Sequence, residues 1–384
     1  MKQAASLDRV AIGHLNPGMI SRDWAMETGL AIIETNGRCK MGCLHCNIAD
    51  ENTKSLAENS PDYLRFIEMY ASQAPRGSNV ILKNGAGSLG AKELALVEKA
   101  LQRGLFITIT TEGLTVPEYF SNRVEELNRE YPGQVGYTVS LDGSRDEIHR
   151  KLRRNIPFDK VTAFIKDQVQ RGVYVETNFV AHSENVGDLK KYVNFCVNEL
   201  GAERVNVLPL QEIGAAAANH LQPPDLVSLV DSLIEAYESG SERVKQAIGH
   251  TIGGYAAKLR EGTERSSCEG CPAGSKHMMM IDSRGDVYPC NSLRDGKYKL
   301  GNIGTLSLKE LHDGDRFRQV RGSIVSSVDG IDSPLNFGCP RIIEKRPEEY
   351  RRALEHLNRK LEESGVDISR IQKEGKRVCY ARTF

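Results

Sequence analysis

The sequence contains no apolar run long enough to cross a membrane. A membrane-spanning helix needs roughly 20 consecutive apolar residues, and no stretch of this chain approaches that length. The N-terminal segment also lacks the continuous apolar core of a secretory signal. These two absences exclude an integral membrane protein and predict a cytoplasmic location.

An excess of charge of either sign is missing as well. Lys and Arg number 51, as do Asp and Glu, so the formal net charge is zero. General nucleic-acid and membrane-surface binders carry a basic excess, so neither kind of partner is expected. The hydrophobic fraction of 40% and the charged fraction of 27% are ordinary for a globular protein. A chain of 384 residues is long enough for one large domain and a smaller one.

Cysteine, in contrast, occurs nine times, and its positions cluster. Without an export signal, clustered cysteines indicate metal binding more than disulfides. The first cluster is the CxxxCxxC run of Cys39, Cys43 and Cys46, which follows the apolar stretch from Leu30 to Ile33. Three thiolates held this close can ligate three irons of a four-iron cluster. The fourth iron then lacks a protein ligand and is open to a small molecule.

This run resembles the signature of the radical S-adenosylmethionine (SAM) enzymes. The resemblance implies that SAM binds the open iron of a [4Fe–4S] cluster and is reductively cleaved to a 5'-deoxyadenosyl radical. It also implies an electron donor, such as flavodoxin or ferredoxin. His45, before the third cysteine, matches a position that packs near the adenine in that family. The alternatives are a zinc knuckle or three unrelated thiols, although zinc sites more often pair CxxC with a distant second pair.

From Leu30 onward, short β-rich runs alternate with amphipathic helices, which predicts parallel strands joined by crossover helices. The expected strands are Leu30–Thr35, Asn79–Lys83, Leu105–Thr110, Val135–Leu141, Val173–Val180 and Val205–Leu210. Six βα units are too few for an eight-stranded barrel. A partial (β/α)6 TIM-type barrel, the fold of the resembled family, fits the count, and its chemistry should lie on loops after the strands.

Helix boundaries are readable too. Ser60-Pro61-Asp62 predicts an N-cap and a proline at the first helical position of a helix from Tyr63 to Ser72. Glycines after a basic last turn predict helix ends at Gly104 and Gly172. Further helices are expected over Asp188–Leu200, from Pro223 with an apolar face, over Ser307–Val320, and over Glu348–Glu362, the last as an exposed, salt-bridged helix.

A second cysteine group, Cys268, Cys271, Cys290 and Cys339, also has metal-ligand spacing. Two β-like runs around a turn containing Gly285 predict a hairpin that brings Cys271 and Cys290 together. The segment resembles the twitch and SPASM domains, which hold auxiliary iron–sulfur clusters. The fold class is therefore α/β, a partial barrel with a small C-terminal twitch/SPASM-like domain.

The further cysteines of the full SPASM pattern are missing, so one auxiliary [4Fe–4S] cluster is expected. Cys379 is an alternative to Cys268 as its fourth ligand, and a four-thiolate zinc site is the alternative to iron. Cys379 lies beside Lys376 and Arg377, where positive charge favours the thiolate. It is thus also a candidate hydrogen-atom donor to a substrate radical, as in radical epimerases.

The resemblance also implies residues that hold SAM. Asn84, Gly85 and Ala86 stand where the family has a Gly-Gly-Glu segment, but the glutamate is absent. Ser140 and Asp142 match its SLDG motif, with a helix N-cap as the alternative for Asp142. The remaining implied contacts are Arg153 for the SAM carboxylate, with Arg154 as the alternative, and Asn178 and Leu208 for the adenosine.

Other reactive residue types are expected in structural roles. Cys196 is expected in the core. His149, His182 and His277 are expected at the surface or in caps, and the alternative is that they are polar wall groups of the substrate site. The expected domains are a lead-in at 1–25, the radical SAM core at 26–222, a helical bridge at 223–265, the auxiliary domain at 266–342, and a helix and tail at 343–384.

The expected substrate is a small polar metabolite, such as a sugar, aminocyclitol or nucleoside, which is oxidised or epimerised. The expectation of a single auxiliary cluster, and a lead-in too short for a peptide-recognition domain, favour this interpretation. The first alternative is a maturase that cross-links or epimerises a ribosomally made short peptide. The second is a non-enzymatic iron–sulfur or zinc protein.

Overall fold

The computed structural model describes residues 29–37, 39–47, 61–75, 77–85, 89–256, 278–326 and 345–364. The expected lead-in at 1–25 and the C-terminal tail after residue 364 lie outside the described residues. Six parallel strands form the barrel in chain order: β1 (Leu30–Glu34), β2 (Asn79–Lys83), β3 (Phe106–Thr111), β4 (Val135–Ser140), β5 (Tyr174–Ala181) and β6 (Arg204–Pro209). The predicted partial (β/α)6 barrel is confirmed, and each strand begins and ends within one residue of its expected bounds.

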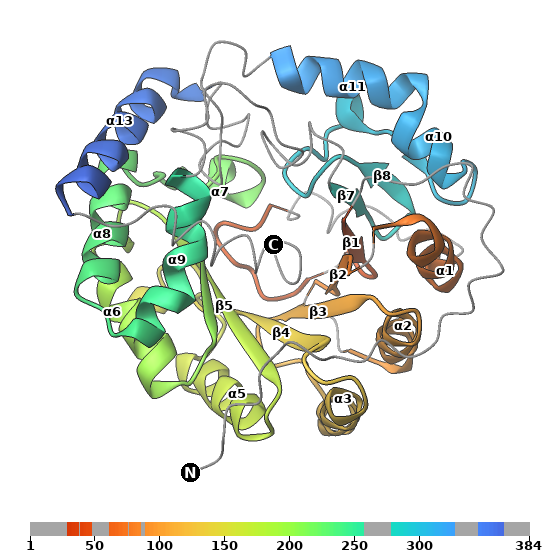
Figure 1. Cartoon of the computed structure of the whole chain (residues 1–384), viewed down its shortest axis with the longest axis horizontal. Coiled ribbons are helices and arrows are strands. Elements are labelled where there is room, and N and C mark those ends of the chain that lie inside the picture. Colours follow the sequence, from red (N-terminus) through yellow and green to blue (C-terminus); the bar gives the residue numbers. More distant parts are fainter. Residues whose placement is uncertain are drawn as a thin grey trace.

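Helices cover the outer face of this sheet (Figure 1). They are α1 (Tyr63–Gln73), α2 (Ala91–Gln102), α3 (Glu118–Glu130), α4 (Asp146–His149), α5 (Phe158–Gln170), α6 (Leu189–Asn194) and the short α7 (Ala215–Ala218). Gly104 and Gly172 have φ of +74° and +73°, which confirms both predicted glycine stops. The helix α1 begins at Tyr63 as predicted, but its N-cap is Asp62 and not Ser60, because the Asp62 side chain accepts from the Arg65 N–H at 2.9 Å.

The strand side chains alternate between two environments. On each strand, alternate residues such as Ile33, Leu82 and Ile109 pack under the helices in the main core, which includes Cys196 as predicted. The other residues point into the barrel, where one end holds a small apolar cluster around Ile32 and Ile81. Beyond this cluster the inner face becomes polar. One register row starts at the last residues of β1 and β2 and reaches the first residue of β6; it runs Glu34, Lys83, Thr110, Thr138, Glu176 and Arg204.

The predicted hairpin is also confirmed, and it continues the barrel sheet. Its first strand β7 (Met278–Ile281) pairs in parallel with β1, and β8 (Asp286–Tyr288) and β9 (Gly301–Asn302) add antiparallel strands. Met279 and Met280 are buried, as expected of hairpin core residues. The auxiliary segment is therefore built directly onto the edge of the barrel where the cysteine loop begins (Figure 1).

Two helix predictions are wrong. The segment after Ser307 forms two helices, α10 (Leu308–Asp313) and α11 (Asp315–Ser326), divided at Gly314. The helix α13 (Pro347–Glu363) is not simply exposed, because Tyr350, Leu354 and Leu357 are buried and the helix packs on α8 (Leu226–Glu238). The helix α8 has the predicted buried apolar face, and α9 (Glu242–Ala256) packs beside β6.

Short 3-10 turns occupy Val186–Asp188 and Gly296–Tyr298, and a π-helical turn at Phe195–Glu199 extends α6. Within the described part of the chain, no helix combines the length and apolar character that a membrane span requires.

Candidate cluster and SAM site

The cysteine loop follows β1 at the end of the barrel where the strands terminate. Two other segments hold its backbone. The Leu44 N–H donates to the Leu152 carbonyl at 2.9 Å, and the Ala215 N–H of α7 donates to the Cys46 carbonyl at 2.9 Å. The Asn219 amide also donates to the Leu44 carbonyl at 3.1 Å. The loop is therefore fixed by residues that follow β4 and β6.

Close packing at Gly214 explains how α7 reaches the loop. A Cβ at this position would lie 2.6 Å from the Cys46 carbonyl oxygen, and the residue has φ of +53°. Both the contact and the backbone conformation require glycine. The segment after β6 can therefore approach the third cysteine only because residue 214 has no side chain.

The three cysteines fit an iron–sulfur cluster. Cys39, Cys43 and Cys46 are all partly buried. The charges of Cys39 and Cys46 act to raise the pKa of Cys43, so the three thiols lie close to one another. Burial raises the pKa of Cys43 to about 11, while Arg153 acts in the opposite direction. Among the described residues no three ligand-type side chains converge on a single metal ion. A four-iron cluster does not need this, because each thiolate binds a different iron.

A buried ion pair lies against this loop. Arg153 Nε donates to Asp142 Oδ2 at 2.5 Å, and the other carboxylate oxygen accepts from the Val180 N–H at 2.7 Å. Burial opposes the charge of Asp142, but Arg153 and the Val180 N–H hold its pKa below the usual range. Asp142 is therefore not a helix N-cap. Both of its oxygens are engaged by the protein, so it acts on the site through Arg153.

The far end of Arg153 touches two residues of the cysteine loop. Nη1 lies 3.7 Å from Cys43 Sγ, and Nη2 lies 3.3 Å from His45 Nε2. An arginine can only donate, so His45 Nε2 accepts and its proton is assigned to Nδ1. Burial, reinforced by Arg153, lowers the pKa of His45 to about 4. His45 is therefore neutral near pH 7.

The expected surface position is wrong for the two other histidines that are described, whereas the expected capping role is seen, because Nδ1 of His149 and Nδ1 of His182 each accept a backbone N–H. His149 and His182 are buried beneath the same network. The Asp142 N–H donates to His149 Nδ1 at 3.2 Å, and burial lowers the pKa of both imidazoles. His277 lies outside the described residues.

The strands bring other predicted SAM residues together. Ser140, Asn178 and Asn206 form one register row on the inner face, and Asn206 donates its amide N–H to Asn178 Oδ1 at 3.0 Å. Asn84, buried, and Gly85 lie at the neighbouring end of β2, whereas Ala86 lies outside the described residues. These residues share the barrel end that holds the cysteine loop.

Leu208 is an exception among the large hydrophobic residues. It lies two residues after Asn206 on the inner face of β6, and 41% of its surface is exposed. Its neighbours Val205 and Val207 point to the opposite face and are buried. A core role, the ordinary expectation for leucine, is therefore excluded for Leu208.

Sequence reasoning missed Glu112. This buried residue directly follows β3, accepts from the Thr115 hydroxyl at 2.7 Å and contributes to the electrostatic environment of Arg153. Its position after a predicted strand was the signal that could have found it. Asn206, which holds the Asn178 side chain through a hydrogen bond, was also missed as a site residue, because it belongs to no recognisable sequence motif.

The auxiliary ligand set is only partly described. Cys290 follows β8 and is partly buried. The other candidates, Cys268, Cys271, Cys339 and Cys379, lie outside the described residues.

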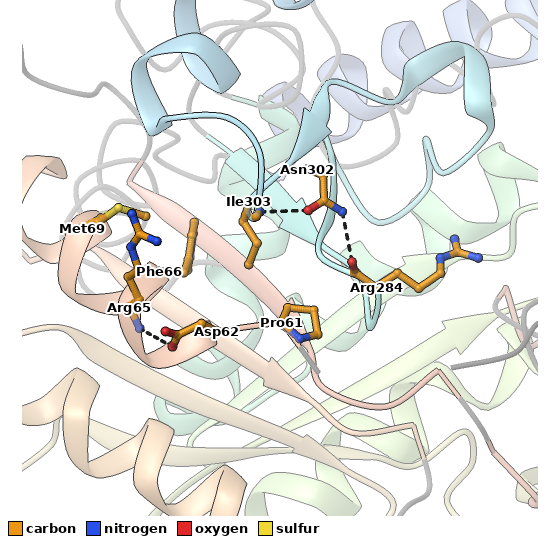
Figure 2. Close-up of a pocket in the computed structure, with 9 residues that line it drawn as sticks. Pro61, Asp62, Arg65, Phe66, Met69, Arg284, Asn302 and Ile303 are labelled. Atoms are coloured by element: carbon orange, nitrogen blue, oxygen red, sulfur yellow. Dashed lines mark hydrogen bonds between the residues drawn. The ribbon is translucent and has the colours of Figure 1, made fainter. Parts of the chain in front are cut away.

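A cavity of about 280 Å³ lies elsewhere, between α1 and the hairpin. Figure 2 shows Phe66 and Met69 of α1 on one side and Asn302 and Ile303 on the other. None of the predicted site residues lines it, so this cavity is separate from the cysteine loop.

Two family models match the chain. The radical SAM superfamily matches residues 33–196, and an iron-sulfur cluster-binding domain, SPASM, matches residues 258–336. The first match contains the cysteine loop and the strands that carry Ser140 and Asn178. The second contains Cys268, Cys271 and Cys290.

Among curated proteins, the PqqA peptide cyclase of Methylorubrum extorquens (strain PA1) is 22% identical over 268 residues, 68% of this chain. The chain spans 65% of the length of that relative. A probable GTP 3',8-cyclase of Methanocaldococcus jannaschii is 23% identical over 185 residues, 47% of this chain and 59% of that protein.

Solved structures share the fold. Native anSMEcpe with bound AdoMet has a TM-score of 0.66 at 15% identity, over 89% of this chain and 99% of that one. Streptococcus suis SuiB bound to the precursor peptide SuiA has a TM-score of 0.59 at 16% identity, over 77% of this chain and 67% of that one.

These comparisons overturn the expectation of a small polar metabolite as the substrate, because the similar proteins include a peptide cyclase and SuiB, which was solved bound to a precursor peptide. They confirm the predicted cofactors, which are SAM, a SAM-binding [4Fe–4S] cluster and an auxiliary cluster. The chain therefore belongs to the radical SAM superfamily, as an enzyme with a C-terminal iron–sulfur cluster-binding domain of the SPASM type.

Proposed function

We propose that this enzyme modifies a ribosomally made peptide by removing a hydrogen atom from one of its residues and so preparing that residue for cross-linking. The observation that carries the proposal is the similarity to a peptide cyclase over 68% of the chain, well beyond the residues of the radical SAM match. The SuiB structure with its precursor peptide supports the same substrate class.

The chain's own residues take the following roles in this proposal. Cys39, Cys43 and Cys46 hold the first cluster, which with SAM supplies the radical. Arg153, fixed by Asp142, binds the SAM carboxylate. The remaining SAM contacts are His45, Asn84, Gly85, Ala86, Ser140, Asn178 and Leu208. Cys268, Cys271, Cys290 and Cys339 would hold the auxiliary cluster, which would supply an electron acceptor for the cross-linking. The proposal includes a flavodoxin or ferredoxin as electron donor and a reducing, cytoplasmic location.

The test is anaerobic reconstitution followed by incubation with SAM, dithionite and short peptides encoded beside the gene. We expect 5'-deoxyadenosine in equal amount to a peptide that has lost a pair of hydrogen atoms. Cys43→Ala should abolish SAM cleavage, and the exposed Arg154→Ala should largely preserve it. A non-enzymatic protein would form no 5'-deoxyadenosine with any peptide.

Epimerisation is the second candidate, supported by Cys379 as a hydrogen-atom donor. It predicts an unchanged peptide mass in ordinary water and the uptake of a deuterium atom in heavy water. Cys379→Ala should then stop product formation without reducing the iron content. Epimerisation is wrong if the peptide loses hydrogen atoms and the Cys379→Ala variant forms the same product as the wild type.

A further inference from the structure

A buried ion pair joins the barrel to the auxiliary segment. Glu34, the last residue of β1, is fully buried, and its two carboxylate oxygens accept from Arg294 Nη2 and Nη1 at 2.9 and 3.0 Å. Arg294 is 8% exposed. The two residues are 260 positions apart in the sequence, so the pair links two domains and not two turns of one element.

The partners of this pair lie on the chain next to the two cysteine segments. Glu34 ends the strand that leads into the loop of Cys39, Cys43 and Cys46. Arg294 follows Cys290, and the turn between them is closed by a bond from the Leu293 N–H to the Cys290 carbonyl at 3.3 Å. The ion pair therefore connects the residue that precedes the first cysteine segment to a residue that follows Cys290.

A second contact lies beside the first. Lys83 is the register partner of Glu34 on β2, and its Nζ donates to Asn291 Oδ1 at 2.9 Å. The residue directly after Cys290 is thus also held by the barrel. The segment from Cys290 to Arg294 is tied to the ends of two adjacent strands.

A further polar contact joins the ends of β1 and β7, and it comes from the helix α1. The Tyr63 hydroxyl of α1 lies 3.1 Å from the Glu34 carbonyl oxygen and 2.9 Å from that of Asp282, which follows β7. Figure 1 shows β7 and β8 beside β1 and α1. The junction therefore relies on directional contacts at several points.

Stability alone does not account for the ion pair. Removing two charges from water costs about as much as their attraction returns, so an apolar pair of similar volume would hold the domains together at least as well. A two-pronged arginine–carboxylate contact adds a fixed direction. We propose that Glu34 and Arg294 are positioning residues that set the placement of the auxiliary cluster relative to the SAM-binding cluster. This inference concerns the two clusters and does not depend on the identity of the substrate.

The test uses the full-length protein with both clusters loaded and reduced. Arg294→Lys keeps the charge but loses the two-pronged contact, and Arg318→Lys on the exposed face of α11 is the matched control. The distance between the reduced clusters, read from their magnetic coupling in pulsed EPR, should be narrowly distributed in the wild type and the control. In Arg294→Lys we expect a broader or shifted distribution, with unchanged iron content and SAM cleavage within about two-fold of the wild type.

Glu34→Gln is the second variant, because it removes the carboxylate charge of the same ion pair on the barrel side. It should give the same change in the distance distribution as Arg294→Lys. If both variants lower the melting temperature and leave the distribution unchanged, the pair is only structural and the proposal is wrong. Loss of iron in Arg294→Lys would also overturn it, since the residue would then be needed to assemble the cluster.

Discussion

The carboxylate of Asp142 and the guanidinium of Arg153 meet at 2.5 Å beneath the cysteine loop, with Asp142 fully buried. The same guanidinium reaches Cys43 Sγ and His45 Nε2. Asp142, two residues after β4, therefore determines the orientation of a group that contacts one predicted cluster ligand, Cys43, and the predicted adenine contact, His45.

The first prediction follows from this arrangement. Asp142→Asn leaves the Arg153 charge buried without its anionic partner, and breaking a buried pair in this way costs about 3–5 kcal/mol. We expect a fall of that size in the free energy of unfolding of the iron-free protein, measured by anaerobic urea denaturation. We also expect weaker SAM binding by the reconstituted protein.

Asp146→Asn is the matched control. Asp146 forms an ion pair with Arg150 in the same loop region, but the side chains of both residues are about half exposed. Solvent screens such a pair, so neither stability nor SAM binding should change much. Equal effects of the two substitutions would contradict the special role of Asp142.

A second prediction concerns pH. Burial lowers the pKa of His149 to about 4, with Asp142 opposing the shift, whereas the unfolded chain titrates near its ordinary 6.5. The unfolded state therefore binds a proton first as the pH falls. The stability associated with a neutral His149 is present above pH 6.5 and is lost as the pH falls from there towards 4.

The expected size of this loss is about 2 kcal/mol at pH 5. The unfolding free energy of the iron-free protein is measured at pH 7 and at pH 5, and the share of His149 in the difference is the part that a variant without this imidazole loses. His149→Asn, which cannot titrate but keeps an acceptor for the Asp142 N–H, should flatten the profile by that amount. An unchanged slope in the variant would show that His149 does not carry the effect.

The sequence predicts well what depends on local pattern. Short β-branched runs and glycine stops place the six strands and most helix ends, since these signals act within a few residues. The pairing of Asp142 with Arg153 and of Glu34 with Arg294 was not predicted, because sequence spacing carries no information on side-chain approach. The burial of α13 was missed because its dense charges concealed an apolar stripe at helical spacing from Tyr350 to Leu361.

The histidines illustrate a second limit. His149 and His182 occur in polar segments that follow β4 and β5, which favours an exposed position. In the structure these segments lie under the cysteine loop, which comes from another part of the chain. Burial created by distant segments leaves no local pattern in the sequence.

A third prediction tests the auxiliary cluster. Cys290→Ala removes a proposed ligand, so reconstituted protein should contain about four fewer irons per chain. SAM cleavage should persist, because the first cluster is untouched. Cys196→Ala, in the core, is the control and should retain the full iron content. Full iron in Cys290→Ala, measured by colorimetric assay together with EPR, would remove Cys290 from the ligand set.

The last prediction separates binding from stability on a single strand. Leu208 is 41% exposed inside the barrel, whereas its neighbour Val207 is 2% exposed and packs under the helices. Leu208→Ser should therefore change the unfolding free energy by less than about 1 kcal/mol. If the side chain covers the adenosine, the loss of that apolar contact should weaken SAM binding about ten-fold.

Val207→Ala is the matched control on the same strand. It should lower the unfolding free energy by about 2 kcal/mol and leave the affinity for SAM unchanged. Titration of SAM into each reconstituted variant, beside urea denaturation, measures both quantities. A Leu208→Ser protein that binds SAM like the wild type would place the adenosine elsewhere in the barrel.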